Sequence, residues 1–182
     1  MNAESNLIAR LKRPKTREKA FLELLDTYQE RLYWHIRKLV VTHENADDVL
    51  QNTFIRIYKG IQKFNGQSAL HTWMYRIAYN ESIRFLNKNR IDTNPLDETH
   101  DKYLEDLTQD LYFDGDAVAL KLHKIISELT AKQQRVFQMK YFDDLSFREI
   151  SKILGVGEST LKSSYYSAVK IIEEKITAVT TN

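Results

Sequence analysis

The chain has 182 residues, a formal net charge of +2, 42% hydrophobic residues and no cysteine. Enough apolar side chains are present to build packed cores, and disulfides and thiolate metal sites are excluded, which fits a cytoplasmic protein. Only five Gly and two Pro favour an all-α fold. There is no run of 18 apolar residues and no charged-then-apolar leader, so we expect neither a membrane span nor a signal peptide.

The small net charge conceals three segments of different charge. Residues 1–90 carry 16 Lys/Arg and 9 Asp/Glu, residues 91–117 carry 1 and 9, and residues 118–182 carry 10 and 7. Basic segments on both sides of an acidic one suit a nucleic-acid-binding protein. The sequence therefore predicts two helical domains, 1–90 and 118–182, joined by a flexible acidic linker, 91–117, which acts either as a solubilising tether or as a mimic of a polyanion.

The N-terminal domain is predicted to hold four helices. Residues 7–11 form a short helix that ends at Pro14, and a periodic apolar pattern then predicts a long helix over 16–39. Two more helices are predicted over 46–64 and 69–89, separated by the Asn-Gly-Gln-Ser loop at 65–68.

The helix predicted over 46–64 has one polar face with an isoleucine in its middle. Its buried stripe is Ala46, Val49, Thr53, Ile57, Gly60 and Phe64, and its opposite face holds Asp48, Gln51, Asn52, Ile55 and Lys59. A lone exposed isoleucine usually has no role. One surrounded by hydrogen-bonding groups could instead be a protein-docking spot.

The helix predicted over 69–89 mixes aromatic and cationic residues on its outer face. Leu70, Met74, Ile77, Ala78 and Phe85 are predicted to face the core, whereas Arg76, Tyr79, Asn80, Ile83, Asn87 and Arg90 face outward, with Trp73 and Arg84 at the border. Rings and guanidinium groups stack on unpaired bases. The loop residues Phe64, Asn65, Gly66 and Ser68 could receive an extruded base. Alternatively Trp73 and Tyr75 complete the core, which is the favoured interpretation of Trp73 taken alone.

The C-terminal domain is predicted to form four helices over 116–128, 131–141, 146–154 and 158–176. The last two are joined by Gly155-Val156-Gly157, as in a helix-turn-helix whose second helix enters the major groove. In that helix Leu161, Tyr165, Ala168 and Ile172 share an apolar face, opposite Ser159, Lys162, Ser163, Tyr166, Ser167 and Lys170. The alternative is an amphipathic helix pair packed into an ordinary helical domain.

No pattern of residues predicts catalysis. The five His show no metal-ligand spacing, and neither a glycine-rich phosphate loop nor a nucleophile elbow is present. The acidic pairs at 47–48 and 143–144 lie at helix starts, where carboxylates stabilise the helix dipole. We therefore expect no enzyme, no metal site, no cofactor and no small-molecule substrate.

Four segments in order resemble the sigma-70 family, specifically its extracytoplasmic-function (group 4) sigma factors. Residues 20–40 resemble the first conserved helix. Residues 45–64 (NADDVLQNTFIRIYKGIQKF) resemble the polymerase-binding helix, residues 71–83 (HTWMYRIAYNESI) resemble the segment that opens and reads the −10 element, and residues 129–170 resemble the −35-reading region. The resemblance implies an alternative RNA polymerase sigma factor that binds core polymerase and promoter DNA, and many relatives are held by an anti-sigma factor.

The resemblance also implies roles for individual residues. Docking on the clamp helices of the largest polymerase subunit would use Asp48, Gln51, Asn52, Ile55 and Lys59. The melted −10 strand would meet Phe64, Asn65, Gly66, Ser68, Trp73, Arg76, Tyr79, Asn80, Ile83 and Arg84. The −35 duplex would meet Glu158, Ser159, Thr160, Lys162, Ser163, Tyr166, Ser167 and Lys170. The acidic linker would follow the RNA exit path, and the C-terminal domain would also rest on the polymerase flap.

The recognition helix departs from the family pattern. Relatives often carry KSRLHRAR, but this chain places Ser164, Ser167 and Val169 at the three arginine positions. Fewer phosphate contacts predict weaker and less salt-sensitive −35 binding, without arginine-to-guanine readout. Two other functions remain open: a dimeric operator-binding regulator that uses residues 1–90 for sensing or dimerisation, and a protein-binding helical adaptor.

Overall fold

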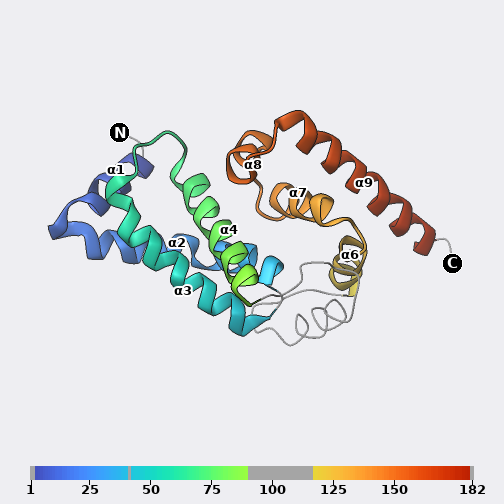
Figure 1. Ribbon diagram of the computed structural model, residues 1–182, viewed down its shortest axis with the longest axis horizontal. Coiled ribbons are helices and arrows are strands. Elements are labelled where there is room, and N and C mark those ends of the chain that lie inside the picture. Colours follow the sequence, from blue (N-terminus) through green and yellow to red (C-terminus); the bar gives the residue numbers. More distant parts are fainter. Residues whose placement is uncertain (1–2, 41, 90–116, 181–182) are drawn as a thin grey trace. The chain divides into compact units, whose positions relative to one another are not determined.

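The computed structural model describes residues 3–40, 42–89 and 117–180, and all regular structure in those ranges is helical (Figure 1). The described helices form two compact units, α1 to α4 and α6 to α9. The prediction of an all-α chain with two helical domains is therefore confirmed. Of the predicted linker, 91–117, only Ala117 is described, as the first residue of α6, so the linker boundaries stay a prediction.

The first unit contains the four predicted helices, with somewhat different bounds. They are α1 (Ala3–Lys12), α2 (Pro14–Val40), α3 (His43–Gly60) and α4 (Leu70–Asn89), and a short 3-10 turn, η1 (Ile61–Lys63), follows α3. Pro14 begins α2 instead of only ending α1, because the first helical position needs no backbone N–H. The predicted helix 46–64 is divided, and Phe64 caps the 3-10 turn in an extended conformation.

The core of the first unit lies between α2 and its neighbours. α2 packs against α1 and α4, and it contributes the fully buried Leu24, Leu32 and Ile36. Its Phe21 ring also meets the Tyr58 ring of α3 edge-on, with centroids 4.9 Å apart. Such contacts bury the apolar faces that sequence periodicity predicted, and they leave the polar faces of α3 and α4 to form the unit's surface.

The second unit contains α6 (Ala117–Ser127), α7 (Ala131–Tyr141), α8 (Phe147–Leu154) and α9 (Glu158–Thr180). Local sequence explains these boundaries. α7 and α8 each start with a capping box, Thr130 with Gln133 and Ser146 with Glu149. α8 ends at Gly155, whose φ of 68° is a left-handed conformation that glycine adopts without strain. The predicted helix-turn-helix is therefore confirmed.

α9 packs on α6, α7 and α8 and completes their core. The buried residues of this core come from α6, the α6–α7 turn, α7 and α9, and they are Ile125, Ile126, Leu129, Phe137, Ala168 and Ile172. Within α9, Leu161 and Ala168 are fully buried, as their helical spacing predicts. The opposite side of α9 therefore stays open to solvent.

Candidate protein and nucleic-acid interfaces

The predicted docking face of α3 is exposed as a continuous strip. Asp48, Gln51, Asn52, Ile55 and Lys59 are all exposed, and Ile55 keeps 45% of its surface in contact with solvent. The opposite stripe is buried except for Gly60, which is half-buried, and Leu50 and Phe54 are buried beside it. α3 therefore presents one half-exposed isoleucine among side chains that can form hydrogen bonds.

A buried carboxylate that periodicity did not predict connects α3 to α4. Oε1 of Glu81 accepts from Arg56 Nε at 2.7 Å and from Arg84 Nη1 at 2.6 Å. The Glu81 side chain is only 9% exposed, whereas both arginine side chains are about half exposed. Glu81 thereby joins Arg56, which is next to Ile55 in α3, to Arg84 of the predicted −10 face.

The outer face of α4 is present, but the core side differs from the prediction. Arg76, Asn80 and Arg84 are exposed, whereas Tyr79 and Ile83 are half-buried. Ile77 and Phe85, predicted to be core residues, are only half-buried, whereas Ser82 and Leu86 are buried; Tyr75 is buried too, as the alternative interpretation of that residue predicted. The difference is a rotation of the buried stripe around the helix axis, which is decided by how α4 packs on α2.

Trp73 lies between the core and the surface. Its ring is 5.1 Å from the Phe64 ring, centroid to centroid, and it lies over Gly60, where an added Cβ would be 3.1 Å from Trp73 Cζ2. Gly60 therefore leaves the room that the indole needs. Trp73 thus completes this corner of the core and keeps part of its ring accessible.

The loop before α4 combines an anchored start with an open turn. Phe64 is buried, with only 6% of its surface exposed, so its ring supports the loop and is not open to a base. Asn65 Oδ1 accepts from the Gln67 backbone N–H at 3.2 Å, and Gly66 takes a φ of 74°. Asn65, Gly66 and Gln67 are exposed and Ser68 is half-buried, so residues 65–68 form the open part of the loop.

The predicted DNA-facing residues of α9 share its solvent side. They are Glu158, Ser159, Thr160, Lys162, Ser163, Tyr166, Ser167 and Lys170, all exposed, and Tyr166 reaches 62% exposure. Ser167 is not free of partners, because its hydroxyl accepts from Gln133 Nε2 of α7 at 3.0 Å. α9 therefore presents a mainly neutral polar surface with two lysines.

Aromatic rings flank this surface where α8 meets α9. The Phe147 ring lies 5.6 Å from Tyr165 and 6.5 Å from Tyr166, and Lys162 Nζ is 5.9 Å from its centre. Burial raises the pKa of Tyr165, with smaller contributions from Tyr166 and Tyr141. Phe147 was not among the residues predicted to lie at the DNA-binding face. The one signal for it in the sequence is that an apolar residue opens α8.

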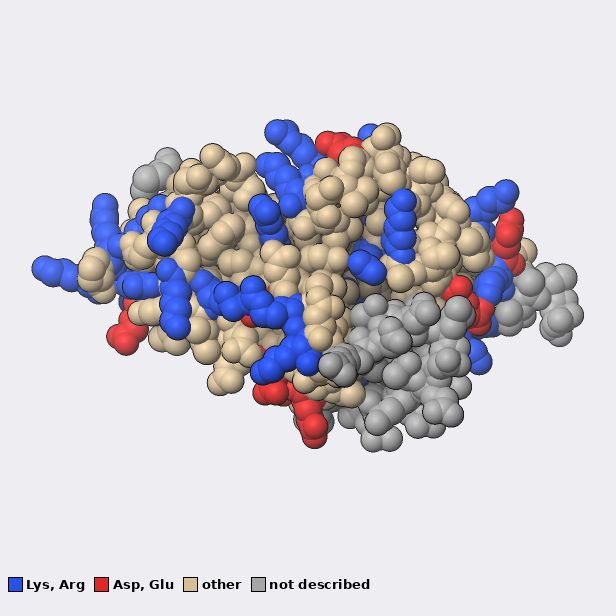
Figure 2. Space-filling view, in the orientation of Figure 1, with Lys and Arg blue, Asp and Glu red and all other residues tan. Residues whose placement is uncertain are grey.

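Figure 2 shows that Lys and Arg predominate on the visible face of the first unit, which suits a polyanionic partner. Among the described residues no cluster of three or more His, Cys, Asp or Glu could hold a metal ion. No helix in the described ranges is long and apolar enough to cross a membrane.

Comparisons with known proteins match both units separately. The family model for sigma-70 region 2 matches residues 24–91, and the model for sigma-70 region 4 matches residues 119–172. The RNA polymerase sigma factor YlaC of Bacillus subtilis is 30% identical, with 82% of this chain and 87% of that protein covered. The extracytoplasmic-function RNA polymerase sigma factor SigW of the same organism is 28% identical, covering 86% and 89%.

Solved structures share the fold. CnrH, solved in complex with the cytosolic domain of CnrY, gives a TM-score of 0.68 at 18% identity and covers 97% of this chain and 99% of its own. The sigma factor RpoE of Bartonella quintana, solved with the anti-sigma factor NepR, gives 0.67 at 19% identity and covers 87% and 98%. On the family matches and the close agreement in length with its relatives, the chain belongs to the sigma-70 family, as an extracytoplasmic-function sigma factor.

Proposed function

We propose that this alternative sigma factor uses three exposed faces: α3 binds core polymerase, the loop with α4 binds the −10 element, and α9 binds the −35 element. The observation that carries the proposal is the outer face of α4, where Arg76, Tyr79 and Asn80 are accessible beside an open loop. A protein that only binds duplex DNA has no use for such a surface. Aromatic and guanidinium groups together suit a strand whose bases are unpaired.

The α3 face is proposed to dock on the clamp helices of the largest core-polymerase subunit. Ile55 would supply the apolar contact at the centre, and Asp48, Gln51, Asn52 and Lys59 would supply the surrounding polar contacts. An apolar centre with a polar rim is the usual arrangement of a protein interface. This role is supported by the exposure of the whole strip and by the resemblance of residues 45–64 to the polymerase-binding helix.

The loop and the outer face of α4 are proposed to bind the melted −10 strand. Asn65, Gly66 and Ser68 would surround an extruded base, and Phe64 would support them from below. Trp73, Arg76, Tyr79, Asn80, Ile83 and Arg84 would follow the strand. Extruding a base costs a few kcal/mol of stacking, so these contacts must offset that cost.

The exposed face of α9 is proposed to read the −35 duplex, and the same domain to contact the polymerase flap. With Lys162 and Lys170 as the only cations on that face, we expect weak −35 binding with a shallow salt dependence. We also propose that the acidic segment follows the RNA exit path.

An anti-sigma factor is a proposed further partner. The solved structure of RpoE contains the anti-sigma factor NepR, and that of CnrH contains the cytosolic domain of CnrY. We expect the chain to carry out no chemical step itself and to act in the cytoplasm with polymerase. The operator-binding regulator is not favoured, because residues assigned in it to sensing or dimerisation match sigma-70 region 2. The protein-binding helical adaptor is also not favoured, because it assigns no function to the exposed face of the helix-turn-helix helix α9.

The test is a pull-down of the purified chain with sigma-free cognate core polymerase, followed by transcription from a genomic fragment library. We expect a stable complex and discrete new start sites that share −10 and −35 sequences. Tight binding to duplex DNA without binding to core polymerase would instead support the operator-binding regulator.

A further inference from the structure

Helix α1 makes side-chain contacts with both ends of the loop that precedes α4. At the loop's start, Lys12 Nζ donates to the Phe64 carbonyl at 2.5 Å. At its end, Glu4 Oε1 accepts from the Leu70 backbone N–H, the first residue of α4, at 3.1 Å. These bonds join residues that are 52 and 66 positions apart in the sequence.

The chemistry of both bonds suits their positions. The first N–H groups of a helix have no partner within the helix, and a carboxylate there also interacts favourably with the helix dipole. Glu4 therefore caps α4 from a different helix. Gln62 of η1 returns the contact, since its Nε2 lies 3.5 and 3.4 Å from the Leu11 and Lys12 carbonyls at the end of α1.

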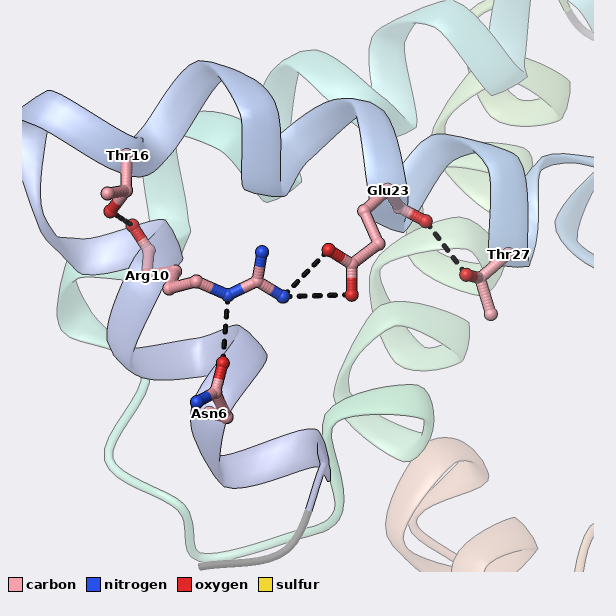
Figure 3. Close-up of polar contacts among 5 residues, drawn as sticks. All are labelled: Asn6, Arg10, Thr16, Glu23 and Thr27. Carbon is pink, nitrogen blue, oxygen red and sulfur yellow. Dashed lines mark hydrogen bonds and ion pairs between the residues drawn. The ribbon is translucent and has the colours of Figure 1, made fainter.

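α1 is itself fixed on α2, so it can hold the loop steadily. Leu7 and Leu11 are buried, and Arg10 Nη2 lies 2.9 and 2.7 Å from the two carboxylate oxygens of Glu23 (Figure 3). Arg10 Nε also donates to Asn6 Oδ1 at 2.8 Å, and Thr16 Oγ1 donates to the Arg10 carbonyl at 2.8 Å. The guanidinium is thus held on two sides, which limits movement of α1 along α2.

The spacing along α1 matches the loop that it spans. Glu4 and Lys12 are eight residues apart, which is about 12 Å along a helix at roughly 1.5 Å per residue. The middle of the loop is exposed at Asn65 and Gly66, and the Asn65–Gln67 turn shapes it, with Gly66 at a φ of 74°. The loop is therefore anchored at its ends and open at its centre.

We propose that α1, which lies outside both family matches, positions the −10 loop through Glu4 and Lys12. This inference rests on the proposed function, because it assumes that the open centre of the loop receives an extruded base. Loop ends fixed in advance lower the ordering cost of base capture. Glu4 and Lys12 are positioning residues here and do not contact DNA.

The test compares two holoenzymes, each with a doubly substituted chain. The α1 variant carries Glu4→Ala and Lys12→Met together, and the matched control carries Glu18→Ala and Lys15→Met together. The control changes the same residue types at exposed sites of α2. Permanganate reactivity of the −10 thymines measures opening at a promoter obtained from start-site mapping. We expect the α1 variant to open about tenfold more slowly, from the loss of two charge-assisted hydrogen bonds, with unchanged affinity for core polymerase.

Two further variants separate positioning from general destabilisation. Lys12→Arg keeps a donor and should retain wild-type opening. Asn65→Ala loosens the loop itself, and in that background the α1 substitutions should add little, because both act through the same loop. Full additivity, or a loss of core binding in the α1 variant, would overturn the positioning role.

The remaining outcomes distinguish the inference from the proposed function. If the wild-type chain opens promoters and Asn65→Ala impairs opening, but the α1 variant behaves as its control, only the inference about α1 fails. If the wild-type chain neither binds core polymerase nor opens any promoter, the proposed function itself fails.

Discussion

Replacing Glu81 with glutamine tests how strongly α3 and α4 are joined. The substitution keeps the side-chain volume but removes the negative charge of the carboxylate. Its Oε1 lies 2.7 Å from Arg56 Nε and 2.6 Å from Arg84 Nη1. Hydrogen bonds to charged groups contribute about 1.5–3 kcal/mol each when buried. Because both arginines are about half exposed and can be rehydrated, each bond is reduced to about 0.5–1 kcal/mol. We therefore expect Glu81→Gln to lower the free energy of unfolding by about 1–2 kcal/mol.

Urea unfolding followed by tryptophan fluorescence measures this loss of stability in the first unit, because both tryptophans, Trp34 and Trp73, lie there. Glu30→Gln removes a charge from an exposed site of α2 and is the matched control. Arg56→Met should cost less in the Glu81→Gln background than in the wild type, since its partner is already weakened. Equal midpoints for Glu81→Gln and its control would show that the shared carboxylate contributes no net free energy of folding, contrary to this prediction.

Four other changes have expected outcomes. Ile55→Asp should reduce affinity for core polymerase at least tenfold, measured by fluorescence anisotropy, while leaving the circular dichroism spectrum unchanged; unaltered affinity would remove Ile55 from the interface. Tyr79→Ala should assemble with polymerase but fail to open the −10 region, and normal permanganate reactivity would contradict its stacking role. Gly155→Ala should destabilise the second unit by about 1 kcal/mol because of the φ of 68°, and no loss of thermal stability would argue against that strain. Burial raises the pKa of Tyr165, so the folded state favours the protonated phenol and stability should fall as pH rises above about 10; Tyr165→Phe should reduce that fall between about pH 8 and about pH 11, measured by urea midpoints.

Local chemistry explains why the helix-turn-helix could be predicted closely. The capping boxes of α7 and α8 each use two residues three positions apart, and Gly155 ends α8 by its own backbone preference. The apolar spacing in α9 correctly predicted that Leu161, Ala168 and Ile172 are buried. The exposed faces of α3 and α9 follow from the same periodicity. Their roles in polymerase and DNA binding are predictions that follow from the family resemblance.

The all-α class, the order of the helices, the family and the solvent-facing residues of α3 and α9 could all be predicted from the amino-acid sequence, because each depends on spacing within one helix or on a contiguous motif. Packing between helices was needed to show that Phe64 is buried under the loop, that Leu86 and not Ile77 is buried in the core, and that Glu81 joins two arginines. The same holds for the bonds from Glu4 and Lys12 to the loop. Their partners are distant in the chain and meet only after α1, α2 and α4 have packed, so periodicity within one helix carries no information about them.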